Sequence, residues 1–264
     1  MHNRDLRWQN PPQENELAPK RRMREKTANQ QLEQLRQQLT QSDDPQNQKS
    51  YKDCIDFLNE CRHSDFYQSL TQRLNDGKTL LAAEWLYYTL TAKNAGENIN
   101  LDVLRKLEQT YADTVYAPNL RVIIEAITLS RGLHLDIEDP GAPLRKALYE
   151  RPDKALFLNL RGINLDQIDL SFAKLHFADF KDSTFRGATL DFSVVNNSRL
   201  SHCNFTDAIA EKVNWANASF SNTAFLRVPL GGKFENVHFH YAYKVESVRV
   251  CGQISGNLLH PAQV

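Results

Sequence analysis

The chain has 264 residues, and its 32 lysines and arginines are balanced by 32 aspartates and glutamates, so its net charge at neutral pH is zero. A balanced charge argues against a protein that binds nucleic acid or membranes through its overall electrostatic field, and we do not expect direct nucleic-acid binding. The apolar content of 41% and the charged content of 24% are typical of a globular protein and exclude a fibrous one.

Three features of the sequence bear on the cellular compartment. The four cysteines show no paired spacing, which favours a reducing compartment over a disulfide framework. No segment is apolar over the roughly 18 residues that a transmembrane helix needs, and Met1–Asp5 lacks the apolar core of a signal peptide. We therefore expect a cytoplasmic protein without a membrane span, and secretion into a host cell by a signal-peptide-independent route stays open.

Residues 1–49 are polar, and we expect them to be mostly disordered and basic, with one short helix. Lys20–Lys26 is a basic cluster, for which a weak patch for nucleic acid, anionic lipid or targeting is one interpretation. A solvated lead into a helix is the interpretation that we favour. Leu32, Leu35 and Leu39 then recur at helical spacing, which predicts a short helix rich in Gln and Leu.

Apolar residues recur at intervals of three and four over residues 50–150, and this pattern predicts a helical domain. Ser64 or Asp65 is expected to cap a helix after a break, and Pro143 is expected to open the last helix. Helices of this length are typical of a small bundle or an array of helical hairpins. The expected helices span residues 51–74 with a break near 64, 78–93, 101–111, 119–130 and 143–150.

A period of five residues organises the next region, which we place at residues 155–243. This period matches neither an α-helix nor a β-strand, and it predicts a very short extended piece and a tight turn in each unit. Two residues before each bulky centre stands a second, mostly small residue, such as Ala178, Ser183 and Ala188. The centres are Leu160, Leu165, Leu170, Leu175, Phe180, Phe185, Leu190, Val195, Leu200, Phe205, then the misfit Ala210, then Trp215, Phe220 and Phe225.

The units Ala178-Asp179-Phe180, Ala188-Thr189-Leu190 and Ala218-Ser219-Phe220 resemble the A(D/N)LXX consensus of the pentapeptide-repeat family. The resemblance implies a right-handed quadrilateral β-helix with four pentads per coil. The whole chain is then α+β, with an N-terminal helical domain followed by the β-helix. Residues in the same place of successive coils should stack, so that Phe185, Phe205 and Phe225 form one internal ladder. Ala210 leaves a gap beside Trp215, which is large enough to fill it.

The five-residue frame changes after Phe225. Phe234 and Phe239 keep the spacing but are offset by one residue, and Val228–Gly232 predicts a bulge or an end loop. Residues 244–264 are expected to form a cap or tail, and the alternation over Tyr241–Cys251 favours one terminal strand. At the other end, the helical domain directly precedes the first coil and is well placed to cover its open apolar end.

We find no set of residues that predicts catalysis, a cofactor or a metal site, so we do not expect an enzyme. Gly77–Thr79 resembles the end of a phosphate-binding loop, but Gln72 stands where that loop needs a glycine. His238 and His240 share a strand face without a third ligand at a matching spacing. Cys203 occupies a small inward place of the repeat and is expected to be structural.

The candidate site is a surface. In the repeat geometry Phe172 and Phe192 lie one full coil apart, face outward and stack on one wall, with Phe177 on the neighbouring wall. Exposed aromatic residues in a column are typical of a protein-binding patch. The alternative, to which we give equal weight, is that the helical domain or a tail folds over them.

The function that we favour is a non-enzymatic protein-interaction scaffold, because a square β-helix offers flat walls and no pocket. Phe157–Gly162, followed by Asn164 and Leu165, is similar to the start of the repeat region in some secreted effectors of pathogenic bacteria. A translocated bacterial effector is therefore the narrower hypothesis. The partner is a protein of unknown identity, and a homodimer is also compatible with the sequence.

Two alternatives come from the same family resemblance. The first is a DNA mimic that inhibits a type II topoisomerase or protects it, which needs an acidic wall. Residues 160–230 hold seven basic and seven acidic residues, so this alternative needs the acids on one wall and the bases on another. The second is a fragment of an effector ubiquitin ligase. Such enzymes need a catalytic domain after the repeats, and Cys251 has no scaffold around it that would activate its thiol.

Overall fold

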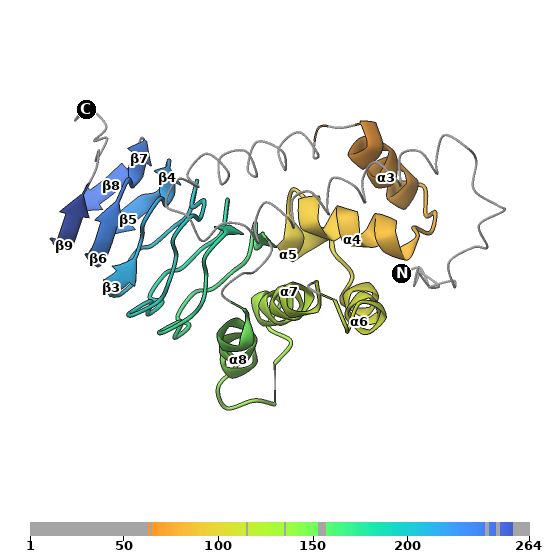
Figure 1. The fold of residues 1–264 in the computed structure, drawn as a ribbon, viewed down its shortest axis with the longest axis horizontal. Helices are drawn as coiled ribbons and strands as arrows, with labels where there is room; N and C mark the ends of the chain where they lie inside the picture. Colours follow the sequence, from red (N-terminus) through yellow and green to blue (C-terminus); the bar gives the residue numbers. More distant parts are fainter. Residues whose placement is uncertain are drawn as a thin grey trace.

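A computed structural model describes residues 63, 65–114, 116–134, 136–152, 157–240, 243–246 and 249–255. The expectations for residues 1–49, with the basic cluster and the short helix, lie outside these residues. In the described part, helices precede strands along the chain, which gives an α+β layout. The helices gather at one end of the molecule, and the last strands lie at the other (Figure 1).

The helical part contains α3 (Asp65–Asn75), α4 (Ala82–Thr91), α5 (Ala95–Asn98), α6 (Leu101–Thr110), α7 (Ala117–Ser130) and α8 (Ala142–Glu150). Within the described part of the chain, none of these helices combines the length and the apolar character that a membrane span requires. Their apolar faces form a common core that continues into the first coils of the strand region.

Capping contacts set the helix ends and explain two differences from the expected spans. The helix expected from residue 78 begins at Ala82, because the Leu81 N–H donates a 2.8 Å hydrogen bond to the Glu84 carboxylate and starts the helix there. After the expected helix end at residue 93, the chain enters a further short helix, α5, at Ala95. The Asn94 side chain accepts a hydrogen bond from the Glu97 N–H, which caps this short helix.

The strand part contains β1 (Leu158–Asn159), β2 (Ala178–Asp179), β3 (Ala210–Asn214), β4 (Ser219–Ser221), β5 (Ala224–Leu226), β6 (Pro229–Glu235), β7 (His238–His240), β8 (Tyr243–Glu246) and β9 (Arg249–Ser255). Between β1 and β3 most extended pieces are single parallel bridges. This is the pattern expected of very short extended pieces separated by tight turns.

The chain winds through coils of four pentads each. Leu158 pairs in parallel with Ala178, and Asn204 pairs with Ala224 in the same way. The expected stacking of one coil on the next is therefore confirmed, whereas the right-handed sense of the coil stays a prediction. A turn follows every fifth position and places one corner residue at positive φ; these corners include Gly162, Gln167, Phe172, Phe177, Asp182, Gly187, Phe192, Asn197, His202 and Asp207.

The interior of the stack is a set of side-chain ladders. The Phe185 and Phe205 rings stack with centroids 4.7 Å apart, and the Phe205 and Phe225 rings stack at 5.4 Å. These rings are almost completely buried, so the expected Phe ladder is confirmed. Apolar burial of this extent is the main source of stability in a repeat architecture.

One coil departs from the regular pattern at Ala210, and the departure explains the frame shift of the sequence. Ala210 pairs with Leu230, but Val213 pairs with Gly232, so β3 has one residue more than β6 between these pairs. Beyond this bulge, paired residues lie one position closer together in the sequence, as in the pairing of Phe220 with Phe239. A bulge is therefore present, but it lies in β3 between Ala210 and Val213. The segment 228–232, where it was expected, contributes instead to the partner strand β6, which has no extra residue.

The C-terminal segment differs from the expected single strand over residues 241–251. It forms β8, which pairs with β5, and β9, which pairs with β6 over its full length. The coils therefore continue to Ser255, past the expected boundary at residue 243. The reason is that β6 offers a long parallel edge, and the alternation of the sequence does not distinguish one long strand from two shorter ones.

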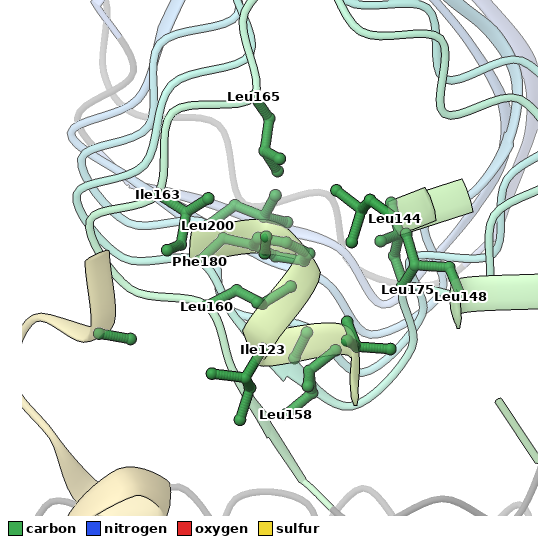
Figure 2. Close-up of a cluster of buried hydrophobic side chains, with 14 of the residues drawn as sticks. Ile123, Leu144, Leu148, Leu158, Leu160, Ile163, Leu165, Leu175, Phe180 and Leu200 are labelled. Atoms are coloured by element: carbon green, nitrogen blue, oxygen red, sulfur yellow. The ribbon is translucent and has the colours of Figure 1, made fainter. Parts of the chain in front are cut away.

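Apolar contacts join the helices to the first coils. Ile123 of α7 and Leu144 and Leu148 of α8 lie in one cluster with Leu158 and Leu160 of the first coil (Figure 2). All five side chains are buried. The helices thus cover the apolar end of the stack, which would otherwise face water.

Polar contacts fix the same junction. The buried Asn159 amide donates hydrogen bonds to the carbonyls of Thr89 and Ala92 at 3.0 and 3.1 Å. The buried Arg151 guanidinium donates to the carbonyls of Lys174 and His176 at 3.0 and 2.7 Å. Because these donors reach across from one part to the other, they fix the orientation of the helices on the first coil.

Candidate interaction surface

The corners of the coil impose a conformational demand on their residues. Each regular corner residue has φ between about 50° and 65°, a region that Gly, Asn, Asp and His tolerate best. Most corners between residues 162 and 236 carry one of these four types. The exceptions are Gln167, Arg227 and three phenylalanines at neighbouring corners, namely Phe172, Phe177 and Phe192.

Phe172 and Phe192 occupy the same corner of successive coils. Their rings are parallel to within 2°, and their centroids lie 4.9 Å apart. They are 62% and 47% exposed, so the described helices do not cover them. The prediction of a stacked, outward-facing pair is confirmed. Phe177 lies at the next corner, half-buried, with its ring 5.7 Å from that of His176.

A lysine extends the aromatic pair. Lys212 stands one coil after Phe192, and its Nζ lies 4.8 Å from the centroid of the Phe192 ring. A cation at this distance from a ring face makes a favourable electrostatic contact. We call Phe172, Phe192 and Lys212 the corner column. Lys212 was not predicted from the sequence, although its spacing of one coil from Phe192 was a sufficient signal.

Carboxylates line one side of the corner column. Asp191 and Glu211 each directly precede a member of the column, and the Asp191 side chain accepts a 2.8 Å hydrogen bond from the Glu211 N–H. Asp169 lies on the same wall, where hydrogen bonds from Ser171 lower the pKa of its carboxyl group. The aromatic pair therefore has acidic groups beside it and a cation at one end.

The acids of the repeats do not gather on one wall. The register of the coils places Asp169, Asp191 and Glu211 on the wall before the corner column. Asp166 and Asp207 lie on the preceding side, where Arg227 forms a two-pronged ion pair with Asp207 at 2.5 and 2.6 Å. A further acid, Asp179, is buried in an ion pair with Arg161. The surface is therefore mixed in charge and offers no continuous acidic wall over the described coils.

Chemistry-bearing residues elsewhere in the coils have structural contacts. In the described segments, no three His, Cys, Asp or Glu side chains lie close enough together to hold a metal ion. Cys203 is buried and its Sγ contacts the Phe180 carbonyl at 3.0 Å; burial raises the pKa of this thiol well above its ordinary value. His238 lies on β7, whereas the side chain of His240 lies outside the described residues.

A comparison with protein families decides the identity of the coils. The family described as pentapeptide repeats matches residues 158–191 and 198–232, with eight copies. The C-terminal part of the chain is a pentapeptide-repeat region. The matched segments include Phe172 and Arg199 but stop at Gly232, where the regular register is lost. No curated protein matches the chain.

Solved pentapeptide-repeat proteins show partial likeness to this chain. One from Nostoc PCC 7120 is 15% identical, covers 35% of this chain and 80% of its own, and gives a TM-score of 0.18. One from the Arabidopsis thaliana thylakoid lumen is 20% identical. The match covers 32% of this chain and 63% of that protein, with a TM-score of 0.16. One from the cyanobacterium Cyanothece 51142 is 19% identical. The match covers 36% of this chain and 88% of that protein, with a TM-score of 0.16.

Proposed function

We propose that this protein is a non-enzymatic scaffold whose pentapeptide-repeat region, a right-handed quadrilateral β-helix, binds a protein partner through the corner column. The observation that carries the proposal is the exposed stack of Phe172 on Phe192 at two left-handed corners. Neither the backbone nor the core requires phenylalanine at these places. A partner that buries both rings would explain why phenylalanine stands at these two corners.

Two energetic terms act on phenylalanine at these corners. A residue other than glycine in the left-handed region costs roughly 1–2 kcal/mol, and Asn and Asp reduce that cost through local hydrogen bonds. Each exposed ring also keeps a large apolar surface in water, which burial under a partner would remove at about 25 cal/mol per Å². Phenylalanine at these corners is therefore unfavourable for the isolated fold and favourable for a complex.

The corner column also suggests the chemistry of the partner. A flat aromatic pair flanked by Asp191 and Glu211 suits a partner surface that presents an apolar or aromatic group beside an arginine or lysine. Aromatic residues and arginine are the side chains that dominate the energetics of protein interfaces. A translocated effector that acts in a host cell is the narrower form of this proposal, and it rests on the resemblance of residues 157–165.

The topoisomerase alternative receives less support than the scaffold. A DNA mimic needs a continuous acidic wall, and the acids of the repeats are spread over several sides with basic residues between them. The ubiquitin-ligase alternative rests on the family resemblance alone. The aromatic corner column, by contrast, is a feature that only the scaffold proposal uses.

The test compares the partners captured by the wild-type chain and by the Phe172→Asn/Phe192→Asn variant, after chemical crosslinking in bacterial and host lysates. We expect the variant to lose the partner while its thermal midpoint stays the same or rises. Relief of left-handed strain at two corners, roughly 1–2 kcal/mol at each, at least offsets the one lost ring stack, which is worth about 0.5–1.5 kcal/mol.

Gln167→Asn/His202→Asn is the matched control, because it also places Asn at two exposed corners but lies away from the corner column. This control should retain the partner. Retention of the same partners by the Phe172→Asn/Phe192→Asn variant would rule out the corner column as the docking site.

A further inference from the structure

A cleft of about 910 Å³ lies where α3 faces the first coils of the pentapeptide-repeat region. One wall comes from α3, with Tyr67, Gln72 and Asn75. The floor and the opposite wall come from Lys93, just after the end of α4, and from basic residues of successive coils. The size falls within the range of small-molecule sites, roughly 300–1,000 Å³.

Among the described residues that line the cleft, every charged side chain is basic. They are Lys93, Arg161, Lys181 and Arg199, and no Asp or Glu is among the described lining residues. The register of the coils brings Arg161 and Lys181 to the same place of successive coils, while Arg199 pairs in parallel with Asp179. Concave, low-dielectric walls concentrate the field of such a cluster, which attracts anions.

The cations differ in how they are held. Arg161 is fixed, because its guanidinium donates to the Lys93 carbonyl at 2.9 Å and to the buried Asp179 carboxylate at 3.0 Å. Lys93 is exposed and Lys181 is half-buried, and neither ammonium group has an ion-pair partner within the described residues. Two lysines thus lie beside a rigid guanidinium, and neither lysine is neutralised by a carboxylate of the described residues.

The wall from α3 supplies polar groups without charge. The Tyr67 hydroxyl accepts a 3.3 Å hydrogen bond from the Lys93 N–H, which ties the lysine backbone to the helix. Gln72 and Asn75 lie one helical turn apart on α3, and their side-chain amides make no hydrogen bond to another described residue. Amides in this position can bind the uncharged polar body of a ligand whose anionic end meets the lysines.

We propose that this cleft binds an organic phosphate, with its phosphate groups against Lys93 and Lys181 and its polar body against the amides of α3. Phosphate suits the site because ammonium and guanidinium groups make strong, charge-assisted hydrogen bonds to its oxygens. A long polyanion such as a nucleic acid suits it less, because the acidic Asp182 directly follows Lys181 in the chain.

The experiment is isothermal titration calorimetry of the full chain with two probes, inorganic tripolyphosphate and ATP, at low salt. We expect both to bind, and ATP to bind more tightly because its nucleoside can contact the α3 amides. Lys93→Ala/Lys181→Ala should weaken both probes by about tenfold or more, as expected for the loss of charged hydrogen bonds. Among the described residues neither lysine ammonium has an ion-pair partner, so this variant should fold normally.

Lys106→Ala/Lys146→Ala is the matched control, because it removes the same charge from two exposed positions outside the cleft. It should bind both probes with wild-type affinity. The proposal is overturned if the wild type binds neither probe, if the cleft variant binds as tightly as the wild type, or if the control is weakened equally. Binding of tripolyphosphate without ATP would overturn the assignment to an organic phosphate.

Discussion

In several pentads the small inward residue makes a hydrogen bond as well as a packing contact. Ser183, Ser198 and Thr223 each donate a hydroxyl hydrogen bond, of 2.6 to 2.8 Å, to a carbonyl of the preceding coil. Cys203 contacts the equivalent carbonyl through its sulfur. The small inward position therefore accepts Ser, Thr, Cys or Ala, because all four side chains are small. Ser, Thr and Cys can also contact a carbonyl of the preceding coil.

Two serines of this set allow a direct comparison. Ser198 donates to the Leu175 carbonyl and accepts from the Ala178 N–H, whereas the buried Ser193 hydroxyl has no hydrogen-bond partner among the described residues. We expect Ser198→Ala to lower the free energy of unfolding by about 1–3 kcal/mol, because it leaves two buried backbone groups unpaired.

Ser193→Ala serves as the control for this prediction. It should leave stability within about 0.5 kcal/mol or raise it, because it removes an unpaired buried hydroxyl. Urea unfolding followed by circular dichroism measures both variants. Equal losses in the two would show that the hydroxyl hydrogen bonds contribute no stability.

At the scale of the element, the bulge between β3 and β6 depends on one glycine. Gly232 has φ of +115°, and a Cβ there would lie 2.0 Å from the Val213 carbonyl oxygen. The extra residue of β3 brings the two backbones this close, so that only glycine fits. The frame shift visible in the sequence after Phe225 is thus tied to a specific backbone contact.

Substitution of this glycine tests the bulge. We expect Gly232→Ala to cost on the order of 3 kcal/mol or more, because the clash is with backbone and cannot relax through a side chain. Thermal unfolding of the variant against wild type measures the loss.

Gly187→Ala is the matched substitution at a regular corner. Gly187 has φ of +64°, and the atom nearest to a methyl group added there would be in the Gln167 side chain, at 3.6 Å. The cost there should be only the left-handed strain, about 1–2 kcal/mol. If the two variants were equally stable, the close approach of β3 and β6 would not exist in solution.

At the scale of the whole molecule, Arg151 connects the helices to the coils. It is fully buried, and its Nε donates to the Asn119 side chain at 3.2 Å while Nη1 reaches two coil carbonyls. Burial lowers the pKa of this guanidinium to about 9, so it keeps its charge at neutral pH. Removal of the side chain would leave several buried acceptors without their donor.

We therefore expect Arg151→Ala to reduce the free energy of unfolding by about 3 kcal/mol or more. Arg121→Ala is the control, since Arg121 is exposed on α7 and pairs with Glu108 across the surface, a contact worth about 0–1 kcal/mol. Chemical denaturation of both variants gives the comparison. A loss for Arg151→Ala no larger than for Arg121→Ala would show that the junction does not need this contact.

The local period of the chain determined the coils. A large and a small residue recur in nearly every pentad, and the backbone can bury both only if it turns at each unit. The internal ladder of Phe185, Phe205 and Phe225 therefore followed from the spacing alone. The exposed stack of Phe172 on Phe192 followed from the same spacing. The frame shift after Phe225 likewise indicated a bulge, because a register change must be absorbed by the backbone.

Only the tertiary structure decided which polar residues are buried and which charges meet. Asn159 and Arg151 look in the sequence like ordinary surface residues, and their burial depends on helices that dock from a distant part of the chain. The basic cleft has the same origin, since Lys93 and Lys181 are neighbours only after α4 packs on the first coil. The structure of a repeat region can be predicted from short-range spacing, because each unit contacts neighbouring units of the same kind. A junction between two unlike parts leaves no period in the sequence, so its contacts are known only from the tertiary structure.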